Sequence, residues 1–406
     1  MMSRRELVAS GLAVASLQAA KKTYSWMEID RMLARGDVRG KLSKDDLPTP
    51  ALTVDLDAFE GNCRRMIDYV KGKGRAIRPH AKTHKCPEIA KYLIRHGAVG
   101  ACSAKLSEAD ALSDNGVGGL LITTAVIGKT KIERAMALAR KRPDTIFSVD
   151  NAQNVRDLND AAAAGKLKVN VAIDLFVGNR TGIQPLDPAV ALGEIISQQP
   201  HLQLAGLQAY AGHASHTVGF ENRKRVSHEA MNPAAETRRI LEQKGISCSL
   251  LSGGSTGTYN IDTEIDGITE LQPGSFMFMD VDYNRIGSQS GDEVYSDFKN
   301  SLFVIATVVS KPKDEQAIVD GGLKAFSTDK PYPPQWRGGS ELPYAFAGDE
   351  HGRLTMKEGK RVNVGDRLEF IIPHCDPSVN LYDRLYAVRG DQVEAVWAIA
   401  GRGRSQ

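Results

Sequence analysis

Between about residues 50 and 280, short apolar runs alternate with amphipathic segments of helical periodicity. Eight of the apolar runs have the composition of strands: RAIRPHA (75–81), AVGACSA (98–104), GLLITTA (119–125), TIFSVD (145–150), LKVNVAIDL (167–175), LQLAGLQAY (202–210), SCSLLSG (247–253) and ELQPGSFMFM (270–279). The segments 86–97, 107–116, 131–141 and 151–165 are examples of the helical pattern. This alternation predicts an α/β fold, a (β/α)8 TIM-type barrel. An open doubly wound sheet is the alternative, and the lack of a G-x-G-x-x-G after the first strand argues against it.

The pattern changes near residue 291. Runs such as NSLFVIATVVSK and RLYAVRGDQVEAVWAI alternate apolar and polar positions and are separated by turns, which is typical of antiparallel strands. We therefore predict two domains: a barrel over residues 57–290 and a smaller all-β domain over residues 291–406. Residues 22–56 are expected to pack partly on the β domain, because SKDDLPTPALTVD contains another strand-like run.

The first 21 residues have a different composition. They combine a basic start, an apolar run and a small-residue end at Ala19-Ala20, which is the layout of an export signal. The pair Arg4-Arg5 resembles a twin-arginine signal. The sequence thus predicts a periplasmic mature protein without a membrane anchor. A leader that stays attached, with a cytoplasmic location, is the alternative.

The overall composition is that of a globular protein. The chain has 406 residues, of which 42% are apolar and 25% charged, with a net charge of +3. No basic block with interleaved aromatic residues is present, so nucleic acid is not an expected partner. The five cysteines are scattered and odd in number, which argues against a disulfide framework.

One lysine stands where the first barrel strand should end. In RPHAKTHK, Lys82 follows the strand-like run, and catalytic groups of barrels lie at the C-terminal ends of strands. A lysine there can be desolvated enough to lower its pKa and act as an amine nucleophile, for instance in a Schiff base with an aldehyde cofactor. Lys85 is expected to be solvated or to face a phosphate. A solvated charge run is the alternative for both.

A glycine-rich loop follows the seventh strand. LLSGGSTGTYN (250–260) would expose several backbone N–H groups at a turn, as anion sites do. Barrels commonly bind phosphate after strands seven and eight. The second Gly-Ser pair, in QPGSFMF (272–278), could complete the same cradle, although many such loops bind nothing.

The segment IIPHCDPSVNLYD (371–383) carries a possible metal pair. His374 and Asp376 are two positions apart and would share one face of an extended strand, with Cys375 pointing the other way. An imidazole and a carboxylate suit a harder divalent ion such as Mn²⁺ or Mg²⁺. An ordinary turn pair is the alternative. Arg180 and Tyr210 also end predicted strands, and Tyr210 could stack on a flat ring or simply pack.

Several of these motifs together resemble one family. RPHAKTHK, GACSAKLSEA, GNRTG, AYAGH, GGSTGT, LQPGSFMFMD and PHCDPSVNLYD are similar to segments of the D-threonine aldolase and D-serine dehydratase family. Members of this family are fold-type III pyridoxal-phosphate enzymes distantly related to alanine racemases. The resemblance covers roughly residues 45–400.

The resemblance implies roles for individual residues. Lys82 would carry the cofactor, Tyr210 would stack on its ring, and Arg180 would lie near its phenolic oxygen. Gln272 stands where racemases of this fold have an arginine beside the pyridine nitrogen, and a neutral glutamine is expected to leave that nitrogen unprotonated. The residues expected to hold the phosphate are Gly254, Ser255, Thr256, Gly274 and Ser275.

The metal segment indicates the branch of the family. Dehydratases of the family show H-x-C, which suits zinc, whereas the residue two after His374 is Asp376, the aldolase pattern. The resemblance therefore implies a homodimeric, pyridoxal-phosphate- and divalent-metal-dependent aldolase. It would cleave D-threonine and other D-β-hydroxy-α-amino acids to glycine and an aldehyde, with Lys82, His374 and Asp376 as catalytic residues. A D-serine dehydratase-like elimination is the main alternative, and an amino-acid racemase is a weaker one.

Overall fold

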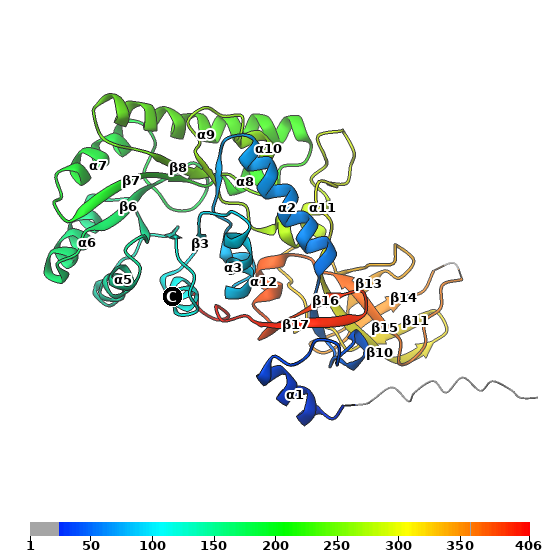
Figure 1. The fold of residues 1–406 in the computed structure, drawn as a ribbon. Coiled ribbons are helices and arrows are strands. Elements are labelled where there is room, and N and C mark those ends of the chain that lie inside the picture. The colour runs from blue at the N-terminus through cyan, green and yellow to red at the C-terminus, as the bar shows by residue number, and fades with distance from the viewer. Residues whose placement is uncertain (1–23, 358) are drawn as a thin grey trace, which may run out of the picture.

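Two β-sheets organise the chain. The computed structural model describes residues 24–357 and 359–406, and the predicted export signal over residues 1–21 lies outside them. An 8-stranded parallel sheet wrapped by helices forms one part of the molecule, and a 9-stranded sheet forms the other (Figure 1). None of the helices in the described part is both long enough and apolar enough to span a membrane.

The parallel sheet is a closed barrel. Its neighbours follow the order β2-β9-β8-β7-β6-β5-β4-β3, and a parallel bridge between His80 and Cys102 joins the two ends. This confirms the predicted (β/α)8 barrel and excludes the open doubly wound sheet. The strands are β2 (Ala76–Ile77), β3 (Ala101–Ser103), β4 (Leu120–Ile122), β5 (Ile146–Val149), β6 (Val169–Leu175), β7 (Leu202–Ala209), β8 (Leu250–Gly253) and β9 (Glu270–Leu271).

Two strands are much shorter than their apolar runs. β2 has two residues of the seven in RAIRPHA, and β9 has two residues of the ten in ELQPGSFMFM. Pro79 and Pro273 follow them and lack the N–H that a strand ladder needs. After Pro273 the chain turns into the 3-10 helix η3 (Ser275–Met277). Each proline thus releases the chain to form a turn at the mouth of the barrel.

Amphipathic helices cover the barrel. In α2 the buried residues Phe59, Cys63, Met66 and Val70 recur every three or four positions, so one face packs on the strands. The Asp55 side chain caps this helix by accepting from the Ala58 N–H at 3.2 Å. The helices are α2 (Leu56–Gly72), α3 (Pro87–Arg95), α4 (Leu106–Asp114), α5 (Lys129–Lys141), α6 (Ala152–Gly165), α7 (Asp187–Ser197), α9 (Phe220–Gln243) and the short α8 (Gly212–Ser215), α10 (Tyr259–Asp262) and α11 (Val281–Asn284).

The second sheet unites both ends of the chain. β1 (Ala51–Asp55) lies between β10, to which it is antiparallel, and β16, to which it is parallel, so residues before the barrel complete the β domain. The remaining strands are β10 (Leu302–Lys313), β11 (Gln316–Val319), β12 (Gln335–Trp336), β13 (Tyr344–Phe346), β14 (Gly352–Thr355), β15 (Arg367–Ile371), β16 (Arg384–Arg389) and β17 (Gln392–Ala398). The N-terminal helix α1 (Trp26–Arg35) contributes Ile29 to a small core with Tyr386 and Val388.

Candidate active site

Lys82 lies on a tight turn between the first barrel strand and helix α3. The 3-10 helix η2 (Ala81–Thr83) follows β2, and the Nδ1 atom of His80 accepts from the Lys82 backbone N–H at 3.4 Å. The His80 Nε2 atom lies 3.2 Å from the Thr123 hydroxyl. Burial, reinforced by the charge of Lys82, holds the pKa of His80 well below its usual value, so a neutral imidazole supports this turn.

A pocket of about 200 Å³ opens at the C-terminal ends of the barrel strands. It brings together four of the predicted cofactor residues, Lys82, Arg180, Tyr210 and Gln272. The Arg180 guanidinium lies 5.2 Å from the centre of the Tyr210 ring. These four residues follow four different strands, and barrel closure places them around one cavity.

The two glycine-serine loops meet beside the Lys82 turn. The Phe276 N–H donates to the Thr256 hydroxyl at 2.9 Å, and a Cβ on Gly274 would collide with the Thr83 hydroxyl. Gly254 has a φ of +74°, which favours glycine. Within the described residues, the backbone N–H groups of Thr256 and Ser275 have no acceptor.

The Ser255 hydroxyl is hydrogen-bonded within its own loop. Thr258 gives its proton to the Asp262 carboxylate, so the Ser255 hydroxyl, 2.8 Å from Thr258 Oγ1, must donate to Thr258. Ser255 therefore braces its own loop. Backbone N–H groups and the Thr256 hydroxyl remain to bind an anion.

His374 and Asp376 lie at the start of a helix and not on a strand. His374 is the N-cap of α12 (Cys375–Val379), and Asp376 belongs to its first turn. The expectation of a shared strand face is therefore wrong. Pro377 explains the helix, because proline is favoured in a first turn. Even so, His374 Nε2 and Asp376 Oδ2 approach to 3.9 Å, while the Cys375 thiol turns away to the Met279 carbonyl at 3.6 Å.

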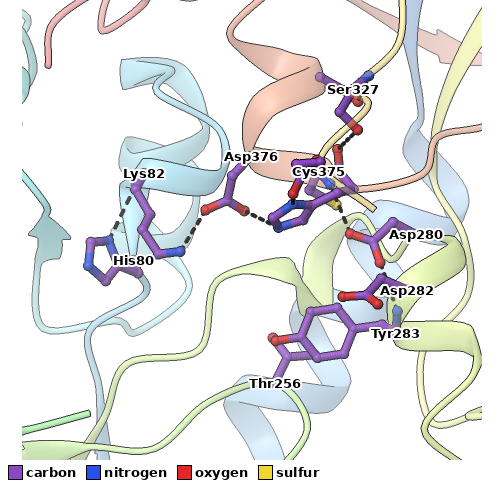
Figure 2. Close-up of polar contacts among 12 residues, drawn as sticks. His80, Lys82, Thr256, Asp280, Asp282, Tyr283, Ser327, Cys375 and Asp376 are labelled. Atoms are coloured by element: carbon purple, nitrogen blue, oxygen red, sulfur yellow. Dashed lines mark hydrogen bonds and ion pairs between the residues drawn. The ribbon is translucent and has the colours of Figure 1, made fainter. Parts of the chain in front are cut away.

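The β domain brings this pair to the barrel lysine. Asp376 Oδ1 accepts from Lys82 Nζ at 2.6 Å (Figure 2). Burial alone would lower the pKa of Lys82, but the Asp376 carboxylate outweighs it and raises that pKa above its usual value. Burial would likewise raise the pKa of Asp376, and the charges of Lys82 and His374 lower it. The predicted low-pKa lysine is thus not found, because desolvation is overcome by an ion pair.

Lys85 neither is solvated nor lines the pocket. Its side chain is 12% exposed, and its Nζ lies 3.8 Å from the buried carboxylate of Glu108. The backbone of Lys85 adopts a φ of +50°, which turns the side chain toward the Gly401 carbonyl at 3.5 Å. Lys85 therefore tethers the C-terminal segment to the barrel.

Sequence reasoning missed Asp329, which contacts His374, and a cluster of ion pairs around Asp282, whose N–H donates to the Pro373 carbonyl. The Asp329 carboxylate lies 2.7 Å from His374 Nδ1, and Lys330 Nζ lies 2.7 Å from Asp282 Oδ2. His216 Nδ1 lies 2.9 Å from the same Asp282 oxygen. Burial would raise the pKa of Asp282, but His216 and Lys330 lower it. Apart from the adjacent Asp329 and Lys330, these residues are far apart in sequence, and no motif links them.

The residues fit pyridoxal phosphate and a divalent ion to different degrees. For the cofactor, the pocket offers an amine, an aromatic ring and a cation, and the two glycine-serine loops offer backbone N–H groups beside the Lys82 turn. Among the described residues, the Gln272 Oε1 atom is buried without a partner. For the ion, His374 offers Nε2 beside Asp376 while a carboxylate fixes its other nitrogen, as is usual for metal-binding histidines. Within the described residues no cluster of three or more His, Cys, Asp or Glu could hold a metal. Two protein ligands leave the remaining positions to water, which suits Mg²⁺ or Mn²⁺.

Comparisons with known proteins agree with this architecture. Residues 54–282 match the family model described as alanine racemase, N-terminal domain, and residues 301–388 match the one described as putative serine dehydratase domain. A D-threonine aldolase of Arthrobacter sp is 38% identical over 88% of this chain and 93% of its own length. A 3-hydroxy-D-aspartate aldolase of Paracoccus denitrificans (strain Pd 1222) is 35% identical over 89% of this chain and 94% of its own.

A solved structure extends the similarity to three dimensions. The crystal structure of D-threonine aldolase from Filomicrobium marinum superposes with a TM-score of 0.86 at 36% identity, covering 91% of this chain and 99% of that one. The closed barrel with its β domain defines a fold-type III pyridoxal-phosphate protein. The chain belongs to the family of D-threonine aldolase and the alanine-racemase-like enzymes, which confirms the resemblance drawn from the motifs.

Proposed function

We propose that this chain is a pyridoxal-phosphate- and divalent-metal-dependent aldolase that cleaves D-threonine and other D-β-hydroxy-α-amino acids to glycine and an aldehyde. The family makes the chain a pyridoxal-phosphate-dependent lyase of the aldolase type. The observation that carries the finer proposal is the 2.6 Å contact between Lys82 Nζ and Asp376 Oδ1. It brings an amine of the barrel and an imidazole–carboxylate pair of the β domain to one point.

The barrel residues bind and orient the cofactor. Pyridoxal phosphate, when bound, supplies the electron sink that allows a bond at the α carbon to break. Lys82 and Lys105 both line the pocket, and we assign the aldehyde carbon of the cofactor to the Lys82 amine. We assign the flat face of the ring to Tyr210, the phenolic oxygen to Arg180 and the phosphate to the loops around Thr256 and Ser275.

The β-domain residues act on the substrate hydroxyl. We assign a divalent ion to His374 Nε2 and Asp376, where it would lower the pKa of an oxygen bound to it. The Asp329 carboxylate forms a hydrogen bond with His374 Nδ1 at 2.7 Å. The other ring nitrogen, Nε2, is therefore the one available to the ion. His216, beside the ionised Asp282 at 2.9 Å, is a second imidazole near this segment and can hold the proton that the hydroxyl releases.

A dehydratase is the second candidate. The match of residues 301–388 to a putative serine dehydratase domain favours it. Elimination would make the hydroxyl a leaving group, whereas retro-aldol cleavage turns the same oxygen into a carbonyl. The carboxylate of Asp376, in place of a thiolate, favours a harder and more hydrated ion, and we therefore place the aldolase first.

The two reactions give different products. The wild-type enzyme loaded with pyridoxal phosphate would be incubated with D-threonine and with D-serine, each with and without exhaustive chelation. We expect glycine and acetaldehyde from D-threonine, little turnover of L-threonine, and loss of cleavage without metal. Faster pyruvate formation from D-serine than glycine formation from D-threonine would favour the dehydratase, and cleavage unchanged by chelation would refute the metal assignment.

A further inference from the structure

Lys105 is a second lysine of the pocket, and its amine has no partner. It lines the cavity together with Lys82 and Arg180. Lys82 Nζ is paired with Asp376 at 2.6 Å, whereas within the described part of the chain Lys105 Nζ forms no ion pair and no hydrogen bond. Lys105 is half-buried, and its amine keeps surface that a ligand can reach.

The backbone that carries Lys105 is fixed from below. The Ala104 N–H donates to the Glu108 carboxylate at 2.8 Å, and Lys85 Nζ lies 3.8 Å from the other oxygen of this fully buried carboxylate. Glu108 is thus already paired with a different lysine. Lys105 is also the N-cap of α4, where a positive side chain opposes the helix dipole. Helix stability therefore does not explain a lysine at this position, whereas an anionic ligand in the pocket does.

Thr124 lies beside Lys105 at the end of the neighbouring strand. In the parallel pair of β3 and β4, Ser103 is paired with Ile122. Lys105 and Thr124 each follow two positions later, and both line the pocket. The Thr124 hydroxyl also has no hydrogen-bond partner among the described residues. An amine and a hydroxyl from adjacent strand ends can donate to the two oxygens of one carboxylate.

The order of the strands places these donors away from the loops assigned to the phosphate. The strand before Lys82, β2, has β9 on one side and, through the bridge that closes the barrel, β3 on the other. The phosphate loops follow β8 and β9, whereas Lys105 and Thr124 follow β3 and β4. Since the phenolic oxygen of the cofactor is assigned to Arg180, the anion left for Lys105 belongs to the substrate.

We propose that Lys105, with the Thr124 hydroxyl, binds the α-carboxylate of the substrate and thereby selects the D configuration. This inference rests on the proposed function. The amine nitrogen of the substrate takes the place of Lys82 Nζ at the cofactor, and the β-hydroxyl faces His374 and Asp376 of the β domain. With the carboxylate held by the barrel, three substituents of the α carbon are fixed at three places. An L amino acid cannot place all three groups there at once.

Binding of glycine, the expected product, tests the contact without an activity measurement. Glycine and methylamine both offer an amine, but only glycine has a carboxylate. Each would be titrated into the cofactor-loaded protein at the same pH, with the cofactor absorbance as the readout. Lys105→Met should weaken glycine binding about 10- to 100-fold, as loss of a hydrogen bond between charged groups does, and should leave methylamine binding unchanged. Lys131→Met, on the exposed face of α5, should match the wild type with both compounds.

Two further variants separate the roles of charge and hydroxyl. Lys105→Arg keeps the cation and should restore most of the glycine affinity, and Thr124→Val should weaken glycine binding by a smaller factor of about 3- to 10-fold. The preference for D- over L-threonine should fall in Lys105→Met. Borohydride should trap the cofactor on Lys82 in every variant.

The possible failures are distinguishable. Equal glycine affinity in Lys105→Met and the wild type would overturn this inference alone. Loss of the cofactor from Lys105→Met would also overturn it, because Lys105 would then hold the cofactor and not the substrate. Failure of the wild type to bind pyridoxal phosphate would overturn the proposed function and this inference with it.

Discussion

At the scale of single residues, the site pairs an amine with a carboxylate that is also a predicted metal ligand. Lys82 Nζ and Asp376 Oδ1 are 2.6 Å apart, and each keeps the other ionised. If Lys82 were joined to the cofactor, its ammonium group would be replaced, and Asp376 would be freer to act as a ligand of a divalent ion. Loading of the cofactor and of the metal are therefore expected to favour each other.

The role of Lys82 can be separated from that of its neighbour Lys85. Lys82→Ala should lose both the cofactor absorbance band and borohydride trapping, because Lys82 is the pocket lysine that we assign to the aldehyde, although Lys105 also lines the pocket. Lys85→Ala should keep both, since its Nζ faces Glu108 and the Gly401 carbonyl. Spectroscopy and mass spectrometry of the trapped peptide provide the measurement. Loss of trapping in Lys85→Ala alone would show that the assignment is wrong.

The support of His374 by Asp329 gives a second prediction. Asp329→Ala should weaken divalent-metal binding by about 10- to 100-fold, as loss of such outer partners does in other sites, with the cofactor spectrum unchanged. Metal titration of the cofactor-loaded protein measures the effect. The exposed Asp349→Ala is the matched control. If Asp329→Ala bound the metal as tightly as the wild type, the assignment of His374 as a metal ligand would be contradicted.

At the scale of elements, a loop of the β domain connects the two parts of the molecule. The segment around residues 327–332 carries Asp329 to His374 and Lys330 to Asp282, and the Tyr332 ring lies 4.5 Å from the Arg285 guanidinium. This loop of the β domain therefore contacts both His374 and the barrel. A shift of the loop would move Asp376 relative to Lys82.

Helix α9 supports the phosphate loop through one buried charge. Arg223 is fully buried and donates to the carbonyls of Gly257, Thr217, Ile286 and Gly287 at 2.7–3.0 Å. Burial lowers the pKa of Arg223, and no carboxylate forms an ion pair with it among the described residues. The carbonyl groups of three loops thus depend on a single side chain.

Removal of Arg223 should loosen these loops together. Arg223→Met should lower the free energy of unfolding by at least about 3 kcal/mol, because several buried carbonyls lose their donor, and should weaken retention of the cofactor. Urea unfolding and dialysis measure the two effects. Arg225→Met, on the exposed face of the same helix, should stay within about 0.5 kcal/mol of the wild type. Equal stability of the two variants would contradict this account.

At the scale of the whole molecule, the barrel mouth exposes apolar side chains. Ile127, Phe176 and Val218 are 53%, 37% and 66% exposed, and all three follow barrel strands on the side of the pocket. Exposed apolar groups on the same side of the barrel are consistent with a contact surface. We propose that a second copy covers this face in a two-fold dimer.

The dimer prediction is tested by a charge at its expected centre. Val218→Asp should shift the protein toward half the wild-type mass in light scattering, because a buried carboxylate would lack a partner. Val309→Asp, at an exposed position of β10, should leave the mass unchanged. A wild type that is monomeric and fully active at nanomolar concentration would contradict the proposal.

Export concerns the chain as a whole and rests on the sequence alone. We propose that Arg4-Arg5 direct the folded enzyme to the periplasm and that the mature chain begins near residue 20. Arg4→Lys combined with Arg5→Lys should retain the protein in the cytoplasm, as cell fractionation would show. Periplasmic protein that still begins at Met1 or Met2 would refute cleavage of the signal.

The sequence by itself determined the barrel, its order of elements and the family. All eight apolar runs contain a strand of the parallel sheet, because periodicity and burial act locally on each segment. The residues expected around the cofactor also follow strand ends, and strands of a closed barrel end at one face. The motifs on those loops were therefore sufficient to predict that one pocket contains Lys82, Arg180, Tyr210 and Gln272.

Only the tertiary structure decided the charge states and the directions of side chains. Lys82 has a raised pKa because Asp376, 294 residues away, lies 2.6 Å from it. The Gln272 amide is held by Gln208 and Ser252, and His374 is fixed by a loop that no motif marks. Electrostatic and hydrogen-bonding partners act through space over a few ångströms. The spacing of residues along the chain therefore does not reveal which residues become partners.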